Sequence, residues 1–324
     1  MRADEVGVVY SPERGAGFSG LVTCGSVWAE PVCARKIAAR RSMEVGAGLL
    51  EWQRQGGTIA LVTLTMRHNA GHRLRQEIDA LLGAWASVKR GRVWSKWQSR
   101  LGSPGLVRVV EITDGDNGWH AHLHFALLLA GSASAGDLVA FTDWLFPKWH
   151  REVVRSGMPG ALALGQDARL VDGVTAAATL GGYLAKDPAE QIGRELLGSF
   201  TKGARSEHST HAVWSIPETF FATGEARLLD RWHEYERATK GRRQIAWSQG
   251  LRDLLAVGQE LTDDEVADEG AGDQAVVLIT RAGWQTVLGL ADPSSRLLSA
   301  LDDGGAAGLR AYLDAHGVEY REAS

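Results

Sequence analysis

The sequence lacks the features that mark membrane and secreted proteins. Its 324 residues contain no run of eighteen or more apolar residues and no charged-then-apolar leader, so we expect neither a membrane span nor a signal peptide. Only two cysteines are present, Cys24 and Cys33, which is too few for a disulfide framework and fits a reducing compartment. We therefore expect a cytoplasmic protein without a membrane partner.

An excess of one charge is also missing, because the formal net charge of the whole chain is only −4. This balance argues against a uniformly basic nucleic-acid binder, but the charges are unevenly distributed. Residues 67–100 hold eight basic and two acidic residues, whereas residues 260–273 hold seven acidic and no basic residues. We expect a basic surface over the first segment and a solvated linker over the second.

Three histidines recur at every second position within residues 118–129: His120, His122 and His124. In a β-strand this spacing points all three imidazoles to one face of the sheet. One alternative is that the rings are simply packed in the core, but burying three adjacent imidazoles without a ligand is costly. Because imidazole is the commonest metal ligand, the pattern predicts a metal site.

A β-hairpin is expected around these histidines. A strand-like run at residues 106–113 precedes a turn rich in Gly and Asp, and the histidine strand follows directly. If residues 115–118 form the loop, the Glu111 carboxylate lies on the histidine face, and a slip of one residue would undo this arrangement. The pairs that this register predicts are Asp114 with Trp119, Glu111 with His122, and Val109 with His124.

The remaining patterns predict an alternation of helices and strands. Residues 1–20 show no period and are expected to form a loosely held arm. Strands are expected at 59–66 and 161–172, helices at 34–53, 72–88, 135–156 and 174–197, two helices around a turn within 229–256, and a strand followed by two helices within 275–320. The predicted divisions are an N-terminal arm and Cys-containing basic segment (1–57), a core (58–205), a helical extension (206–258), an acidic linker (259–274) and a small C-terminal α/β module (275–324).

Several segments carry side chains suited to DNA. Residues 89–97 alternate aromatic rings with cations, which favours stacking on bases and contact with phosphates, although Trp85, Trp94 and Trp97 fit a core equally well. The basic residues of the 34–53 helix and of the turn at 240–243 could contact phosphates or be merely solvated. The residues predicted to contact DNA are Arg35, Lys36, Arg40, Arg41, Lys89, Arg90, Arg92, Trp94, Lys96, Lys240, Arg242 and Arg243.

Tyrosine is scarce, with five in the chain, and two of them are credible nucleophiles: Tyr183 and Tyr235. Tyr183 is preferred because two glycines precede it and give access to it. Lys186 shares its face if the segment is helical, and could stabilise a phenolate or bind the adjacent phosphate. The alternative is that Tyr183 is a packed helix residue.

Taken in order, these motifs resemble those of rolling-circle replication initiators of the HUH endonuclease superfamily, of the type found on plasmids and integrative elements of high-GC bacteria. The Val-Thr-Leu-Thr strand at 62–65 resembles the first motif of that family, residues 118–124 resemble its metal motif, and residues 183–186 resemble its nucleophile motif. Residues 235–251 are similar as well. The resemblance runs from about residue 24 to about residue 268.

The resemblance implies an α+β fold with a central antiparallel sheet and flanking helices, in which a ferredoxin- or RRM-like core carries helical additions. It implies that two or three of His122, His124, His120 and Glu111 hold one Mn²⁺ or Mg²⁺ ion, with His122 and His124 the surest ligands. Tyr183 would attack a phosphodiester and form a 5′-phosphotyrosine, leaving a 3′-hydroxyl primer. The implied partners are single-stranded DNA, double-stranded origin DNA, and the host helicase and polymerase.

The sequence departs from the family pattern at one position. Relatives usually show a segment resembling Cys-Gly-Ser-hydrophobic-Trp-x-Cys-Pro-x-Cys, whereas this chain has Glu30 in place of the middle cysteine. A structural zinc site built on Cys24 and Cys33 is therefore not expected, although Glu30 could offer an oxygen ligand.

Three other functions remain open from the sequence. A DNA-binding regulator could retain the fold and lose cleavage, and it would tolerate loss of Tyr183. A transposase or relaxase could use the same chemistry within the enzyme class. An unrelated metalloenzyme acting on small molecules would need an apolar pocket, and the basic and aromatic residues at 89–97 count against it.

Overall fold

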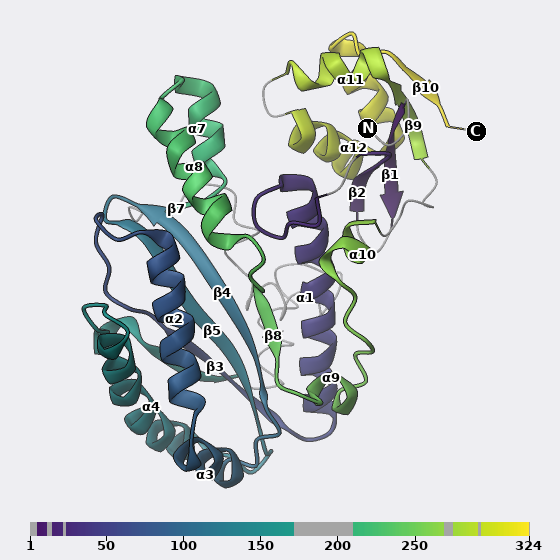
Figure 1. The fold of residues 1–324 in the computed structure, drawn as a ribbon. Coiled ribbons are helices and arrows are strands. Elements are labelled where there is room, and N and C mark those ends of the chain that lie inside the picture. The colour runs from purple at the N-terminus through teal and green to yellow at the C-terminus, as the bar shows by residue number, and fades with distance from the viewer. Residues whose placement is uncertain are drawn as a thin grey trace. The chain divides into compact units, whose positions relative to one another are not determined.

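The structure is a computed structural model, and it describes residues 5–11, 15–21, 24–171, 210–268, 275–290 and 293–323. The chain forms two compact units, one of residues 41–260 and one that combines residues 1–40 with residues 261–324. Each unit contains an antiparallel sheet with helices packed on it (Figure 1). The mixed fold with antiparallel sheets flanked by helices, expected from the sequence, is therefore confirmed.

The sheet of the larger unit places the predicted histidine strand at its centre. The strands follow in the order β6-β3-β5-β4-β7, and β8 pairs with β4 as well. All described pairings in this sheet are antiparallel. The strands are β3 (Thr58–Leu64), β4 (Leu106–Gly115), β5 (Gly118–Leu129), β6 (Asp167–Val171), β7 (Thr210–Ala212) and β8 (Ile245–Trp247).

The β4–β5 hairpin has the register that the sequence predicts. Glu111 pairs with His122, and the other two predicted pairs are also present. The turn is tighter than a four-residue loop, because Gly115 and Gly118 pair with each other and only two residues remain at the tip. Gly118 has a φ of +93° and its Cβ position would lie 2.9 Å from the Ala70 backbone, so this position requires glycine.

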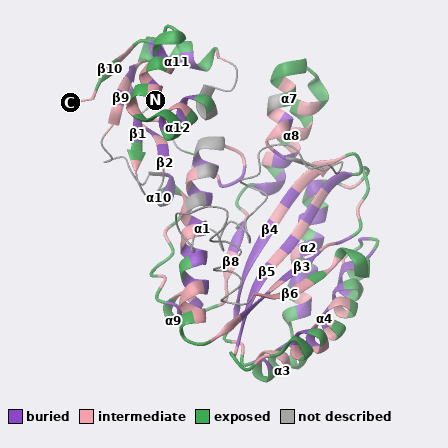
Figure 2. Ribbon diagram, turned by 180° about the vertical axis from the view of Figure 1, so that it is seen from behind, coloured by how far each residue is buried: buried purple, intermediate pink, exposed green. Residues whose placement is uncertain are grey.

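One face of this sheet is covered by α2 (Leu74–Lys89) and α4 (Ala135–Arg155) (Figure 1). The short α3 (Arg92–Arg100) follows α2 and lies at one end of this pair. The odd-numbered residues of β5 point to these helices and are buried. The Phe125 ring lies 4.8 Å from the Trp85 ring of α2, measured between centroids. Figure 2 shows the resulting alternation of buried and less buried residues along β4 and β5.

The opposite face of the sheet carries the even-numbered residues of β5. At the end of the strand this face is buried against Val45 and Leu49, which belong to α1 (Pro31–Arg54), and against residues of β8 and α9 (Leu251–Leu254). The apolar residues Ala126 and Leu128 fill that end. The three histidines occupy the start of the same face. Along this face of β5, the side chains therefore change from half-buried histidines to buried apolar residues within a few positions.

The smaller unit joins the two termini in one sheet of order β10-β9-β1-β2. Residues 1–20 are thus not a loose arm where they are described, because Val6 and Val8 are fully buried and β1 pairs with β9. The elements of this unit are β1 (Glu5–Ser11), β2 (Gly15–Ser19), α10 (Asp263–Asp268), β9 (Ala275–Thr280), α11 (Arg281–Leu288), α12 (Pro293–Ala315) and β10 (Tyr320–Glu322), together with the first residues of α1.

Three further expectations require correction. The acidic segment expected to be a linker contains α10, whose Val266 and Ala267 are buried. The second helix expected within 229–256 is wrong: after α7 (Ser215–Thr223) and α8 (Ala226–Thr239) the chain forms β8 and only the short α9. Residues 161–172 begin with a 3₁₀ turn, Ala163–Gly165, before β6.

The helix predicted at 174–197 lies outside the described residues. Among the helices that the structure does describe, none is long and apolar enough to cross a membrane.

Candidate metal centre

Glu111 of β4 and two histidines of β5, His122 and His124, form a cluster of potential metal ligands. Each offers one donor atom, and these atoms all lie within 4.8 Å of one another. The nearest pair is His124 Nε2 and Glu111 Oε2, which lie 2.8 Å apart. The cluster arises because the hairpin register places Glu111 opposite His122 on the face where His124 also points.

Thr63 of β3 fixes the orientation of the His124 ring. Its Oγ1 lies 3.0 Å from His124 Nδ1, and the two residues are paired in the β3–β5 register. A hydrogen bond at Nδ1 leaves Nε2 directed toward Glu111 and available to a cation. Thr63 therefore supports the cluster from the neighbouring strand.

The state of His122 fits a metal ligand. Its Nε2 atom is shielded from solvent and has no hydrogen-bond partner in the described part of the chain. Burial, together with the neighbouring His120, lowers the pKa of His122 to about 3. The imidazole is therefore neutral at physiological pH and keeps a lone pair for a cation, whereas an unpartnered buried nitrogen would otherwise cost free energy.

His120 lies beside the cluster and is not among its three donors. Its ring centroid is 3.7 Å from that of His122 and 4.3 Å from that of His68, a residue of the segment after β3. Burial lowers the pKa of His120 to about 4 and also lowers that of His68. His68 was missed by the sequence patterns, and its position just after the predicted 59–66 strand was the one available signal.

Two imidazoles and one carboxylate make a donor set for a divalent cation: the carboxylate suits Mn²⁺ or Mg²⁺, and the imidazoles suit Zn²⁺ or Fe²⁺ as well. The residues present thus fit a divalent ion and do not select among these metals. The three donors come from two paired strands at the centre of the sheet, so the backbone hydrogen bonds of the hairpin hold them in place.

A buried carboxyl lies behind the histidine strand. Glu77 of α2 is 0% exposed, and burial raises the pKa of its carboxyl to about 8. The backbone of Ala121 and the Arg231 guanidinium of α8 lower this pKa but do not offset burial. The Glu77 side chain is therefore mostly protonated at neutral pH.

The predicted nucleophile Tyr183 and its neighbour Lys186 lie outside the described residues. The alternative tyrosine, Tyr235, is 2% exposed and packs on the rings of Trp119 and Trp232. Burial raises the pKa of its phenol far above the usual value. Tyr235 is thus a core residue of α8, which disfavours it as a nucleophile because the phenolate would have to form without solvent.

The basic and aromatic stretch at 89–97 separates into a buried and an exposed part. Trp94 is 6% exposed and packs between Trp85 and the α4 residues Phe141 and Trp144, so the prediction that it stacks on DNA bases is wrong. The cations predicted for this stretch are exposed: Lys89, Arg90, Arg92 and Lys96.

The basic residues of α1 are largely engaged within the protein. Arg41 is 5% exposed and its Nη1 lies 3.2 Å from Glu44, so its prediction as a phosphate contact is wrong. Lys36 donates a hydrogen bond to the Ala267 carbonyl at 2.7 Å. Arg40 is half-buried, and the side chain of Arg35 lies outside the described part.

The turn after α8 is more accessible. Lys240 is exposed, and the Arg243 side chain is 76% exposed. Arg242 instead binds Asp79 of α2, with 2.7 Å between Nη2 and Oδ1, and therefore helps to hold α8 on α2. The contribution of this turn to DNA binding stays a prediction for Lys240 and Arg243.

The arrangement as a whole defines a mixed α/β unit whose central antiparallel hairpin presents two imidazoles and a carboxylate. Comparison with known proteins agrees with the family that the sequence motifs resemble. The family model described as "Replication protein" matches residues 22–146. "Protein rep" of Streptomyces lividans is 31% identical over 360 aligned positions, which cover 88% of this chain and 77% of that protein.

The chain therefore belongs to the Rep family of replication proteins. It is also 34% identical, over 41% of its length, to a "Neomycin resistance protein" of Streptomyces cyanogenus, of which the match covers 36%. No solved structure matches the chain.

Proposed function

We propose that this replication protein is a rolling-circle initiator that nicks and rejoins one DNA strand at a defined site. The single observation that carries the proposal is the cluster of Glu111, His122 and His124 on the central hairpin, with an unpartnered His122 nitrogen. A divalent cation bound there would polarise a phosphodiester and offset the charge that develops during its cleavage. Family membership supports DNA as the substrate.

The residues of the cluster have separate tasks in this proposal. His122 and His124 supply neutral nitrogen donors, and Glu111 supplies the negative charge that a divalent ion needs. Thr63 keeps the His124 ring turned toward the cluster through Nδ1. His120 lies at the edge, where it contacts both His122 and His68, and could join the ligand set only by a change in its side-chain position.

In the proposed reaction the Tyr183 hydroxyl loses its proton and its oxygen attacks the scissile phosphorus. A new phosphate ester joins the tyrosine to the 5′ end, and the bond to the 3′ oxygen breaks, which releases a 3′-hydroxyl. Because the ester retains the free energy of the phosphodiester, a later 3′-hydroxyl can attack it and regenerate both the DNA bond and the tyrosine. Lys186 would stabilise the phenolate or the phosphate.

Strand contacts would be made by exposed cations of the larger unit. Lys89, Arg90, Arg92 and Lys96 form the densest exposed group, and Lys240 and Arg243 add a second. Such residues bind the phosphate backbone irrespective of sequence and weaken with added salt. Host helicase and polymerase acting in the cytoplasm would then extend the 3′-hydroxyl.

The proposal is tested by incubating the full chain with Mn²⁺ and labelled single-stranded oligonucleotides tiled across origin DNA, and by scoring covalent adducts on denaturing gels. The expected result is an adduct that depends on Mn²⁺, disappears with EDTA, and is lost in Tyr183→Phe but kept in Tyr235→Phe. Origin binding without any adduct would overturn the proposal in favour of a cleavage-inactive DNA-binding regulator. An adduct lost only in Tyr235→Phe would show that Tyr235, and not Tyr183, is the nucleophile.

A further inference from the structure

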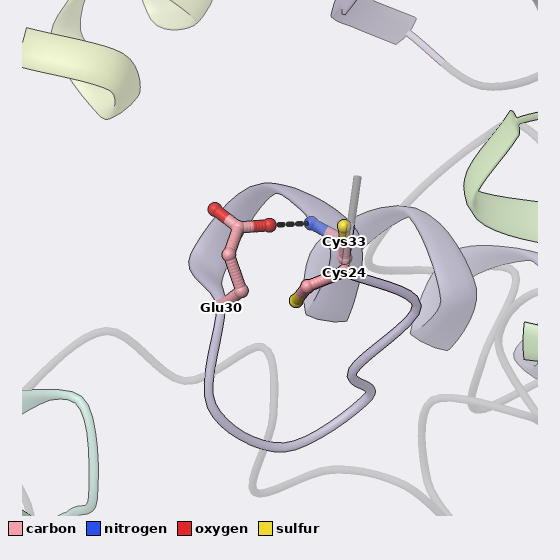
Figure 3. A group of neighbouring side chains, drawn as sticks. All are labelled: Cys24, Glu30 and Cys33. Carbon is pink, nitrogen blue, oxygen red and sulfur yellow. Dashed lines mark hydrogen bonds between the residues drawn. The ribbon is translucent and has the colours of Figure 1, made fainter. Parts of the chain in front are cut away.

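A second cluster of potential ligands lies in the smaller unit, away from the histidines in the chain. Cys24, Glu30 and Cys33 each place one donor atom within 4.8 Å of the other two (Figure 3). Cys33 is 2% exposed, whereas Cys24 is exposed to solvent. Two thiols and a carboxylate are brought together within ten residues of chain.

We propose that Cys24, Glu30 and Cys33 form a binding site for a thiophilic divalent cation such as Zn²⁺, with water as the fourth ligand. In tetrahedral zinc sites the metal–sulfur distance is about 2.3 Å, which separates two sulfur ligands by about 3.8 Å. The donors here lie within 4.8 Å of one another, so shifts of roughly 1 Å would bring them onto one ion.

The segment that carries the donors is already ordered. The Ser26 hydroxyl accepts hydrogen bonds from the backbone N–H groups of Trp28 and Ala29, at 3.2 and 3.0 Å. Val27 and Trp28 are each 4% exposed, and Gly25 adopts a φ of +59° close to the Asp264 side chain. A preformed loop lowers the ordering cost of binding, because the ion does not have to fold the segment.

The carboxylate of Glu30 already has one structural role. Its Oε2 accepts a hydrogen bond from the Cys33 backbone N–H at 2.6 Å, and its carbonyl accepts one from Ala34 N–H at 2.8 Å, so the residue caps the start of α1 (Figure 3). A cap alone explains the carboxylate but not the two sulfurs beside it. A carboxylate has two oxygens, and each can bind a donor or a cation.

A bound cation would clip the Cys24 end of the loop to the first turn of α1. The first turns of α1 also contact α10, through the hydrogen bond from Lys36 to the Ala267 carbonyl. The cation would therefore stabilise the part of the smaller unit where the Cys24 loop, α1 and α10 lie. Three protein ligands and one open position distinguish this site from a closed four-ligand zinc site. The site would contribute to stability and would have no part in the DNA chemistry.

The test is a Co²⁺ titration of the full-length, reduced and chelator-stripped chain, followed by its thiolate-to-cobalt charge-transfer absorption. Because the chain has only two cysteines, this absorption reports on Cys24 and Cys33 and ignores a cation at the histidines. The expected result is a saturable band that is displaced by Zn²⁺ and is lost in Cys24→Ser. Cys24 is exposed, so this variant should fold.

Glu30→Gln keeps the helix cap and removes the charged ligand. Its amide oxygen still accepts a hydrogen bond from Cys33 N–H but carries no charge. We expect it to weaken cobalt affinity by roughly tenfold or more, whereas Glu51→Gln, near the end of the α1 helix that Glu30 caps, should leave the affinity unchanged. Glu30→Cys should strengthen both the affinity and the band. Absence of the band in the unsubstituted, reduced chain, or unchanged affinity in Glu30→Gln, would each overturn the proposal.

Discussion

The two ligand clusters of this chain differ in both donor chemistry and support. Glu111, His122 and His124 lie on two paired strands at the centre of a sheet, whereas Cys24 and its partners lie on a loop and the first turn of a helix. Nitrogen and oxygen donors on a rigid hairpin suit a cation that must bind phosphate oxygens during a reaction. Sulfur donors on a short loop suit a cation that holds local structure.

The difference also extends to what surrounds each cluster. The histidine cluster is held by the β4–β5 register and by Thr63 on the next strand, whose Oγ1 lies 3.0 Å from His124 Nδ1. Hydrogen bonds within residues 24–34 support the cysteine cluster, and its loop also approaches Asp264 at Gly25. We infer that substitutions around the first cluster affect catalysis, whereas substitutions at the second affect local stability.

The largest effect is expected for His122→Ala. Because a catalytic cation contributes several kcal/mol to the stability of the transition state, its loss should slow Mn²⁺-dependent nicking by roughly 10²- to 10³-fold. The rate is measured with the labelled origin oligonucleotide at saturating DNA. His233→Ala, which removes an exposed histidine of α8, is the matched control. A His122→Ala chain that nicks at the unsubstituted rate would remove this residue from the site.

Thr63→Val should slow nicking only by lowering the affinity of the site for Mn²⁺. The substitution keeps the β-branched shape and removes the hydroxyl that lies 3.0 Å from His124 Nδ1. We expect the Mn²⁺ concentration that gives half-maximal nicking to rise by about 10- to 100-fold, with most of the rate recovered at saturating Mn²⁺. Thr142→Val on α4 provides the control. An unchanged Mn²⁺ requirement would show that Thr63 does not position the ligand.

Glu77→Gln tests whether the carboxyl behind the histidine strand is neutral. Its pKa is about 8 in the folded chain against an ordinary 4.5, so the folded state holds a proton that the unfolded state releases. Stability must therefore fall as pH rises from about 5 to about 8, by at most about 1.4 kcal/mol per pH unit. Replacing the carboxyl by an amide removes this loss.

The measurement is urea unfolding of both chains at pH 6, 7 and 8. The difference in free energy of unfolding, Glu77→Gln minus the unsubstituted chain, should grow by roughly 1–3 kcal/mol over this range. Asp143→Asn, at an exposed position of α4, should show no such trend. A difference that is constant with pH would mean that Glu77 is ionised when folded.

The smallest effect is expected for His122→Ala on cobalt binding at the cysteine cluster. His122→Ala should leave the amplitude of the thiolate-to-cobalt band at saturating Co²⁺ unchanged, because no sulfur lies in the histidine cluster. The measurement is the Co²⁺ titration repeated with this variant. A weaker band would show that the two sites depend on each other.

The histidine hairpin was predictable because its information is local. A short turn rich in Gly and Asp joins two strands, and alternation along each strand fixes which side chains share a face. These features predict that Glu111 lies opposite His122, and the observed register agrees. The helices at 72–88 and 135–156 follow from equally local periods, whereas the central place of the histidine strand was implied only by the family resemblance.

The elements that were not predicted depend on distant partners. β1 pairs with β9, about 270 residues away, so its buried Val6 and Val8 could not be recognised from the first residues alone. β8 has only three residues, and its pairing with β4 decides its conformation. The interleaved rings near Trp94 fit either DNA or core, and only packing on α4 decides between them.

The most direct test of the central claim is to identify the tyrosine that carries DNA. The Mn²⁺-dependent adduct is digested with nuclease and protease, and mass spectrometry locates the residual 5′-phosphonucleotide on a peptide. The account predicts the modification on Tyr183 and its absence when His122 is replaced by Ala. A modification on Tyr235, which is buried against Trp119 and Trp232, or an adduct that forms without the histidine cluster, would contradict the account.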